Sequence, residues 1–232
     1  MKVSIVIPAH NEEKRIGKVL KKILKQNLDV VVVDDGSTDN TYKVLQNFQF
    51  SISKKQASLI SNFQLLRHRV NLGKGAAMKT GAEYAFKNGA DAVIFMDSDG
   101  QHDASDLPLF VNKLKENRDS LIVGTRNLSY GVPLVRYVGN KFASLLVAFL
   151  FHSYVSDLLC GFRAMTKDTY KKIVWDSAGY AVETEMVINA VKKGVKVTEI
   201  PIRAVYLDSV KGVTILDAVN ILVDVVSWRV KK

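Results

Sequence analysis

The sequence has little cysteine, a shortage of acidic charge and no long hydrophobic run. Its single cysteine, Cys160, excludes an internal disulfide, so the cysteine content gives no sign of secretion. The longest stretch without a formal charge, residues 142–156, is shorter than the roughly 20 apolar residues of a membrane-spanning helix. The segment after Met1 lacks the basic and apolar regions of a signal peptide. We therefore expect a folded cytoplasmic protein without a spanning helix.

Basic residues outnumber acidic ones, with 33 Lys and Arg against 23 Asp and Glu and a formal net charge of +10. Such an excess suits an anionic partner, namely a nucleotide, a phospholipid surface or nucleic acid. The basic residues are spread along the chain without a zinc-finger or RNP-like motif, so we expect no nucleic-acid partner. For any single lysine, surface solubility is the simpler explanation.

Short apolar segments alternate with helical patterns through the first half of the chain. Residues 30–33 and 92–96 predict buried strands, and Asn11 predicts the N-cap of a first helix with Glu12 and Glu13 in its first turn. Buried strands separated by helices predict an α/β fold whose mostly parallel central sheet has helices on both faces. In such sheets ligands bind beyond the carboxyl ends of the strands.

The second half predicts very apolar helices. Residues 142–151 are apolar almost all round, and residues 213–228 carry apolar side chains at helical spacing, with Arg229 and Lys231 just beyond. Amphipathic helices with nearby cations lie on anionic membrane surfaces. We therefore expect membrane-interface helices here, with packing on the core or a dimer contact as the competing interpretation.

Two carboxylates, Asp97 and Asp99, follow the predicted strand 92–96. Residues two apart in an extended segment point to the same side, so both can face one cation. Hard oxygen ligands favour Mg²⁺ or Mn²⁺, and Gln101 offers a further neutral oxygen. An Asp-rich turn without a metal is the alternative.

A second acidic pair, Asp34 and Asp35, ends the strand 30–33. Adjacent carboxylates repel each other, and a carboxylate accepts hydrogen bonds from a base or a ribose hydroxyl, so we expect Asp35 to hold a nucleoside. Further along, glycines around Lys74 permit close approach of the backbone to a ligand, and Lys74 supplies a cation. The spacing there is not that of a P-loop.

Taken in order, these segments resemble the family 2 inverting glycosyltransferases, which have the GT-A (Rossmann-like) fold. The matching segments of the first half are residues 6–13, 33–39, 71–75 and 97–99. Residues 124–126 and 157–163 resemble the polyprenyl-phosphate branch, which includes dolichyl-phosphate mannose and glucose synthases. The resemblance implies a single domain over residues 1–232, with a nucleotide-sugar-binding half at 1–124 and an acceptor-binding half at 125–232.

The resemblance also implies roles for individual residues. Those expected to hold the nucleoside are Pro8, His10, Glu12 and Asp35. Those expected to bind the metal and the diphosphate are Asp97, Asp99 and Gln101. Those expected to meet phosphate groups or to act in transfer are Lys74, Arg126, Arg136 and Asp157.

The implied reaction is a metal-dependent inverting transfer of a hexose. The donor is a nucleotide sugar of the GDP-mannose or UDP-glucose type, and the acceptor is a polyprenyl (dolichyl) phosphate, used at the cytoplasmic face of the membrane by a peripheral enzyme. Three alternatives stay open. A family 2 transferase with a sugar or protein acceptor would need a general base, a nucleotidyltransferase would release pyrophosphate, and a non-catalytic module would bind nucleotide without turnover.

Other polar residues have simpler explanations. His68 and His102 are explained as surface polar groups, although His102 is beside the predicted metal motif. Glu183 and Glu185 begin a predicted helix, where acidic side chains favour the helix dipole, and we prefer that explanation to a role as base. Trp175 is expected to pack in the interior or at an interface.

Overall fold

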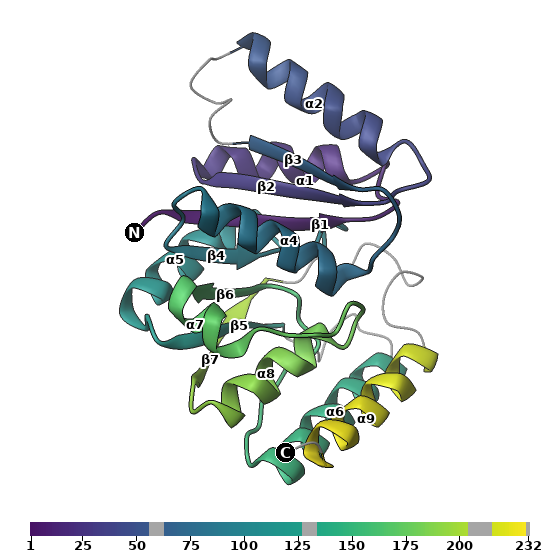
Figure 1. Cartoon of the computed structure of the whole chain (residues 1–232), viewed down its shortest axis with the longest axis vertical. Coiled ribbons are helices and arrows are strands. Elements are labelled where there is room, and N and C mark those ends of the chain that lie inside the picture. Colours follow the sequence, from purple (N-terminus) through teal and green to yellow (C-terminus); the bar gives the residue numbers. More distant parts are fainter. Residues whose placement is uncertain (56–62, 127–133, 204–214, 231–232) are drawn as a thin grey trace.

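A central sheet organises the computed structural model, which describes residues 1–55, 63–126, 134–203 and 215–230. Seven strands are described, in the order β3-β2-β1-β4-β6-β5-β7 (Figure 1). Their bounds are β1 (Val3–Ala9), β2 (Asp29–Asp35), β3 (Phe63–His68), β4 (Ala92–Phe95), β5 (Ser120–Arg126), β6 (Arg163–Thr166) and β7 (Lys196–Ile202). Neighbours are parallel except that β6 runs antiparallel to β4 and β5. The predicted mostly parallel sheet is confirmed.

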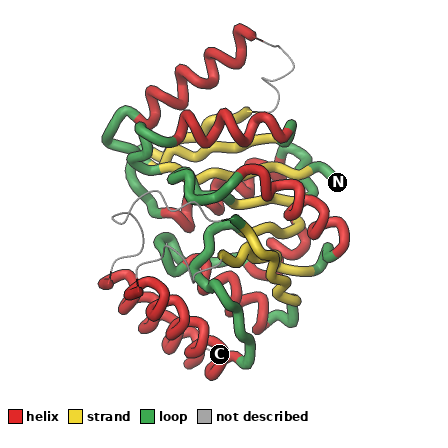
Figure 2. The backbone as a smooth tube through the Cα atoms, turned by 180° about the vertical axis from the view of Figure 1, so that it is seen from behind, coloured by secondary structure: helices red, strands yellow, loops and turns green. Residues whose placement is uncertain are grey.

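Helices cover both faces of this sheet, as predicted. They are α1 (Ile16–Ile23), η1 (Leu24–Gln26), α2 (Thr41–Lys55), α4 (Lys74–Lys87), η2 (Ala104–Asp106), α5 (Leu107–Glu116), α6 (Leu134–Phe151), α7 (Lys167–Ile173), α8 (Val182–Lys192) and α9 (Ile215–Val230). One core lies between the sheet and α4, α6, α7, α8 and α9, and the other lies between the sheet and α1, α2 and α5. Figures 1 and 2 show these two layers from opposite sides.

The register of the parallel strands brings their carboxyl ends to one edge of the sheet. β1 and β2 pair so that Ala9 lies opposite Asp34, and β1 and β4 pair so that Val6 lies opposite Phe95. Every residue of β1 and β4 is buried, and both segments are apolar except for Ser4, as expected for strands covered on both faces. The polar segments that follow β1, β2 and β4 therefore meet at this edge.

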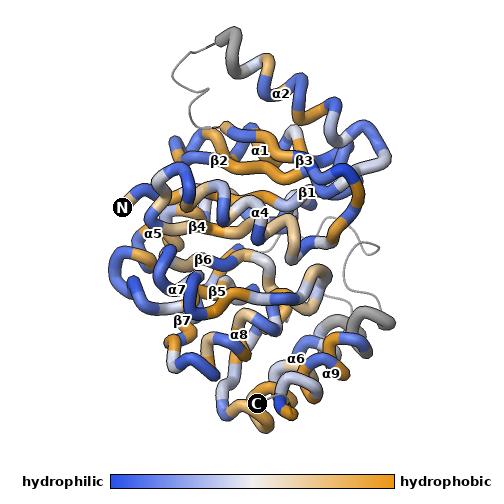
Figure 3. Tube along the Cα trace, in the orientation of Figure 1, coloured by the Kyte–Doolittle hydropathy of each residue, from blue (hydrophilic) through white to orange (hydrophobic). Residues whose placement is uncertain are grey.

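The helices α6 and α9 lie side by side and pack on α8 (Figures 1 and 2). Their inner sides contribute Val147, Ile221 and Val225 to the core, while Phe149 is 79% exposed and Val230 is 77% exposed. Figure 3 shows hydrophobic stretches along both helices. Two amphipathic helices therefore occupy the C-terminal half, as predicted.

The predicted start of the first helix, with Asn11 as its N-cap, was wrong. α1 begins at Ile16 and has no acidic residue in its first turn. Asn11 instead adopts a left-handed conformation with φ of 54°, and its Oδ1 accepts a hydrogen bond from the backbone N–H of Thr38 at 2.9 Å. Asn11 thus fastens the end of β1 to the turn after β2. The strand β6 and the helix α7 were not predicted at all.

Two helical glycines offer opposite tests of the packing. A methyl group at Gly81 on α4 would overlap Cγ1 of Val6 and lie 3.2 Å from Cγ2 of Val33, whereas no described atom lies within 4 Å of one at Gly139 on α6. We expect Gly81→Ala to lower the free energy of unfolding by about 1–3 kcal/mol through overpacking. Gly139→Ala should raise it by up to about 1 kcal/mol through helix propensity. Urea unfolding measures both, and a stabilising Gly81→Ala would contradict close packing of α4 on β1.

Candidate active site

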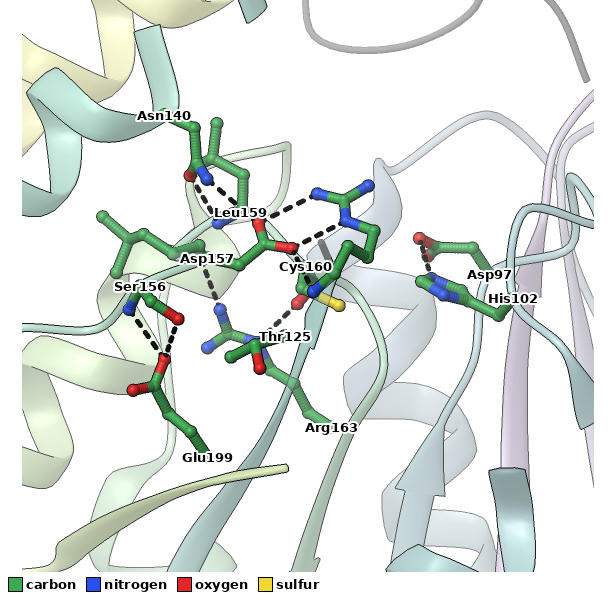
Figure 4. Close-up of polar contacts among 12 residues, drawn as sticks. Asp97, His102, Thr125, Asn140, Ser156, Asp157, Leu159, Cys160, Arg163 and Glu199 are labelled. Atoms are coloured by element: carbon green, nitrogen blue, oxygen red, sulfur yellow. Dashed lines mark hydrogen bonds and ion pairs between the residues drawn. The ribbon is translucent and has the colours of Figure 1, made fainter. Parts of the chain in front are cut away.

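Asp97 stands just beyond the end of β4 and is engaged through both of its oxygens. The Nζ atom of Lys74 lies 2.6 Å from Oδ1. On the other side, Nε2 of His102 lies 3.1 Å from Oδ2, as Figure 4 shows. Because an ionised carboxylate only accepts hydrogen bonds, His102 carries a proton on Nε2. His102 is only 4% exposed, so its assignment as a surface polar group was wrong. Burial favours the neutral form of Asp97, but the ion pair with Lys74 outweighs it and holds the pKa of Asp97 well below its usual range.

Lys74 joins Asp97 to a second carboxylate, that of Glu183 on α8. Its Nζ lies 2.6 Å from Oε1 of Glu183, whose side chain is 3% exposed. Burial opposes the charge of the ammonium, yet the two carboxylates raise the pKa of Lys74 above its ordinary value. The sequence-based preference for Glu183 as a residue of the helix dipole therefore overlooked an ion pair. We call Asp97, Lys74 and Glu183 together the lysine bridge.

Asp99 completes the acidic motif beside the lysine bridge. Its Oδ1 accepts a hydrogen bond from the backbone N–H of Gln101 at 2.9 Å. Burial and the neighbouring charge of Asp97 raise the pKa of Asp99. Within the described residues, no group of three or more His, Cys, Asp and Glu side chains is arranged to hold a metal ion. Two carboxylates still fit the hard-oxygen chemistry of Mg²⁺ or Mn²⁺, provided that water or a ligand supplies the other oxygens.

The loop 157–161 packs directly against Asp97. A Cβ atom at Gly161 would overlap the carboxylate of Asp97, so only glycine permits this approach. At the start of the loop, the buried Asp157 accepts hydrogen bonds from Arg126, at 2.7 Å from Nε and 3.0 Å from Nη2. It also accepts one from Nδ2 of Asn140 on α6 at 3.1 Å. Arg126 and Asp157, both predicted site residues, thus form a bidentate ion pair.

A buried arginine holds this loop in place (Figure 4). The guanidinium of Arg163 is fully buried and donates hydrogen bonds to the backbone carbonyls of Leu158, Cys160 and Glu183. Burial lowers the pKa of Arg163. No role was predicted for Arg163, although a charged residue among apolar neighbours was the available signal.

The predicted nucleoside residues lie at the ends of β1 and β2. Pro8 belongs to β1, His10 donates through Nδ1 to the backbone carbonyl of Asp35 at 2.8 Å, and Glu12 is buried nearby. The carboxylate of Asp35 accepts hydrogen bonds from Leu72 N at 2.9 Å and from Gly73 N at 2.8 Å. Asp35 therefore shapes the loop that leads to Lys74, and its contact with a nucleoside stays a prediction.

His68 supports Asp35 from β3. Its Nδ1 lies 2.7 Å from Oδ1 of Asp35, and its Nε2 lies 3.0 Å from Oγ1 of Thr80 on α4. Since the carboxylate accepts, Nδ1 is the protonated nitrogen and Nε2 accepts from Thr80. His68 thus links β2, β3 and α4, and its assignment as a surface group was wrong.

The first turn of α4 is closed by the segment 175–178. The carbonyl of Ala178 accepts hydrogen bonds from the N–H groups of Gly75 and Ala76, and Nε1 of Trp175 donates to the carbonyl of Gly75 at 2.9 Å. Glu185 fixes this segment by accepting from the N–H groups of residues 176 and 177. Trp175 is a packing residue, as predicted. Of the remaining predicted site residues, Arg136 belongs to α6, but its side chain lies outside the described part.

Three comparisons place the chain among known proteins. The model of the family described as glycosyl transferase family 2 matches residues 4–174. An uncharacterised protein of Methanocaldococcus jannaschii is 37% identical over 210 residues, which cover 88% of either chain. The UDP-N-acetylglucosamine–dolichyl-phosphate N-acetylglucosaminyltransferase of Methanococcus voltae is 30% identical over 217 residues, covering 89% of this chain and 86% of that one.

Among solved structures, one similar fold is that of glucosyl-3-phosphoglycerate synthase from Mycobacterium tuberculosis, in complex with Mn²⁺, uridine diphosphate and phosphoglyceric acid. The TM-score is 0.72 at 19% identity, over 98% of this chain and 78% of that one, which shows a shared fold alone. The family match covers more than half of the chain and includes Asp35, Lys74, Asp97 and Asp99. The chain therefore belongs to glycosyl transferase family 2 and is a glycosyltransferase with the GT-A fold.

Proposed function

We propose that this glycosyltransferase transfers a hexose, with inversion, from a nucleotide sugar of the GDP-mannose or UDP-glucose type to a polyprenyl (dolichyl) phosphate. The observation that carries the proposal is the lysine bridge beside Asp99, which gathers carboxylates and a cation where β4 ends. The acceptor class is supported by the M. voltae relative, whose name specifies dolichyl phosphate. We assign donor binding to residues 1–124 and acceptor binding to residues 125–232 of a single domain.

In the proposed reaction, an oxygen of the acceptor phosphate attacks the anomeric carbon from the face opposite the leaving group. The new C–O bond forms as the bond to the donor's β-phosphate oxygen breaks, and the nucleoside diphosphate leaves with the electron pair. The acceptor phosphate is already anionic at neutral pH, so no proton has to be removed from it. The protein's task is then to orient two anions and to stabilise the departing one.

We assign the metal site to Asp97 and Asp99, with Gln101 as a further oxygen ligand. A bound Mg²⁺ or Mn²⁺ would neutralise charge on the donor diphosphate. Lys74 lies at the same strand end and supplies a second positive charge for the diphosphate. Pro8, His10, Glu12 and Asp35 are assigned to the nucleoside end of the donor.

Arg126 is assigned to a phosphate group, with Asp157 as the residue that orients it. Two hydrogen bonds from the guanidinium to Asp157 fix the plane of the Arg126 side chain. Asn140 ties the same carboxylate to α6, so the arginine is held relative to the amphipathic helices. Arg136, at the start of α6, is assigned to phosphate as well.

We further propose that the enzyme works as a peripheral protein at the cytoplasmic face of a membrane. Phe149 on α6 and Val230 on α9 are among the most exposed apolar side chains described, and Leu145 is 60% exposed. Amphipathic helices with nearby cations bind anionic lipid surfaces, to which each cation contributes about 1 kcal/mol. Across the described residues, no helix has both the length and the apolar character to cross a bilayer.

The direct test of the proposed reaction is a donor panel with a short polyprenyl phosphate and Mn²⁺ or Mg²⁺. The panel contains GDP-mannose, UDP-glucose and UDP-N-acetylglucosamine, and both nucleotide release and the glycolipid product are measured. We expect one donor to yield a glycosyl phospholipid of inverted anomeric configuration. Nucleotide release without a glycolipid, for every donor, would contradict the proposed acceptor.

Metal dependence is tested at Asp99. We expect Asp99→Asn to lower the transfer rate at least about a hundredfold, because the proposed ion loses a charged ligand while the side-chain volume is kept. Thermal unfolding serves as the control for an intact fold, and Asp103→Asn, in the nearby 3-10 helix cap, is the matched variant expected to keep activity. Full transfer in excess EDTA would refute the metal assignment.

The membrane surface is tested at Phe149. We expect Phe149→Asp to weaken flotation with anionic liposomes at low salt while leaving nucleotide binding intact, because it puts a negative charge on the proposed lipid-facing side of α6. Leu109→Asp is the matched control, since Leu109 is an exposed leucine on α5, which covers the other face of the sheet. Equal flotation of the two variants would remove the lipid-facing assignment of α6.

A further inference from the structure

We propose that Lys74 stands in for the metal ion at Asp97 when no donor is bound, and that it thereby makes tight metal binding depend on the donor. Glu183 is the positioning residue that keeps Lys74 there. The inference deepens the proposed function and rests on it for the metal site at Asp97 and Asp99.

Both carboxylate oxygens of Asp97 already have partners in the structure. One oxygen of its carboxylate faces the ammonium of Lys74 at 2.6 Å, and the other faces His102 at 3.1 Å. A divalent cation on either oxygen of Asp97 would therefore lie next to an ammonium group that the same carboxylate holds. Like charges at such a separation repel strongly in a partly buried site, so the ion binds well only when Lys74 moves off.

Glu183 keeps the ammonium of Lys74 beside Asp97. A lysine side chain has many rotamers, and ordering it costs free energy that its contacts have to offset. The carboxylate of Glu183, 2.6 Å from Nζ, provides the second partner. The backbone of Glu183 is held in turn by Arg163, which donates to its carbonyl. The lysine bridge thus spans from the end of β4 to the first turn of α8.

Asp97 and Asp99 cannot by themselves complete the coordination of a divalent ion. Asp97 and Asp99 are two carboxylates, and the described residues contain no cluster of three His, Cys, Asp or Glu side chains for a metal. Mg²⁺ and Mn²⁺ prefer six oxygen ligands, and substrate phosphates commonly supply some of them. A donor diphosphate would provide oxygens for the ion and also a new anionic partner for Lys74. One binding event would then exchange the lysine for the metal at Asp97.

The test measures Mn²⁺ binding by the full-length protein without donor or acceptor, using the electron paramagnetic resonance signal of free Mn²⁺. We expect Lys74→Met to bind Mn²⁺ about tenfold more tightly than the wild type, because the competing ammonium is gone. Glu183→Gln should bind Mn²⁺ more tightly than the wild type but less tightly than Lys74→Met, because Lys74 loses the second partner that keeps it at Asp97. Lys87→Met, at the exposed end of α4, removes the same charge far from the bridge and should leave the affinity unchanged.

A second arm adds uridine diphosphate and guanosine diphosphate in turn. The nucleotide that binds should tighten Mn²⁺ binding by the wild type severalfold more than Mn²⁺ binding by Lys74→Met, since the variant has no lysine to displace. Thermal unfolding confirms that each variant is folded, and Lys74→Gln replaces Lys74→Met if the latter is not.

The outcomes separate the inference from the proposed function. If both Lys74 variants bind Mn²⁺ like the wild type without nucleotide, the inference is wrong, while metal-dependent transfer can still stand on its own assay. If the wild type binds no Mn²⁺ even with nucleotide, the metal assignment fails and the inference fails with it. A loss of Mn²⁺ binding in Lys74→Met would also overturn the inference, because Lys74 would then support the ion.

Discussion

The arrangement at the strand ends depends on one buried positive charge, the guanidinium of Arg163. Removing a charged group from water costs several kcal/mol unless it is paired or hydrogen-bonded. Arg163 meets this cost with hydrogen bonds to three backbone carbonyls, two in the loop 157–161 and one at Glu183. An apolar side chain of the same size would remove these three hydrogen bonds, which is itself expensive in a buried place. The loop and the start of α8 are therefore held together by the same side chain.

The antiparallel strand β6 explains why this arginine sits where it does. In a parallel sheet the start of every strand lies at the edge opposite its carboxyl ends, but an antiparallel strand reverses this. Arg163 is the first residue of β6 and pairs with Phe95, two residues before Asp97. The loop that precedes β6 is thereby delivered to the edge where β4 ends. Gly161 can then contact the carboxylate of Asp97, and Glu183 can reach Lys74.

Local patterns predicted the parts of the site that are local in origin. Residues 92–96 are apolar and rich in strand formers, so the position of Asp97 and Asp99 beyond a strand followed from the sequence alone. Lys74 was likewise singled out by the glycines around it, and in the structure it begins α4 beside Asp97. The helix start after Asn11 was wrong because an Asn side chain serves equally well as a cap and as an acceptor from a neighbouring turn, here that of Thr38.

Local sequence patterns could not predict contacts between segments that are far apart in the chain. The strands β4, β5 and β6 lie between Lys74 and Glu183 in sequence. Acidic residues at a helix start also have an adequate local explanation. His68 likewise contacts Asp35 and Thr80 only because β2, β3 and α4 come together in the fold. The family resemblance pointed to the donor-side and metal motifs and to a role for each residue. It did not indicate which side chains contact one another. Pairing of charges across the sheet emerged only from the fold.

The charge at the end of β4 explains why a cation is central to the proposed chemistry despite a net charge of +10. The carboxylates of Asp97 and Glu183 contact the ammonium of Lys74, and the carboxylate of Asp99 lies close enough to interact with it electrostatically. The nearby charge of Asp97, together with burial, raises the pKa of Asp99. A donor diphosphate would add more negative charge to the same place, where partial burial weakens solvent screening. One lysine does not offset that sum. A divalent cation does, and it has the further property of attracting the acidic residues and the diphosphate at once, which turns their mutual repulsion into a shared binding site.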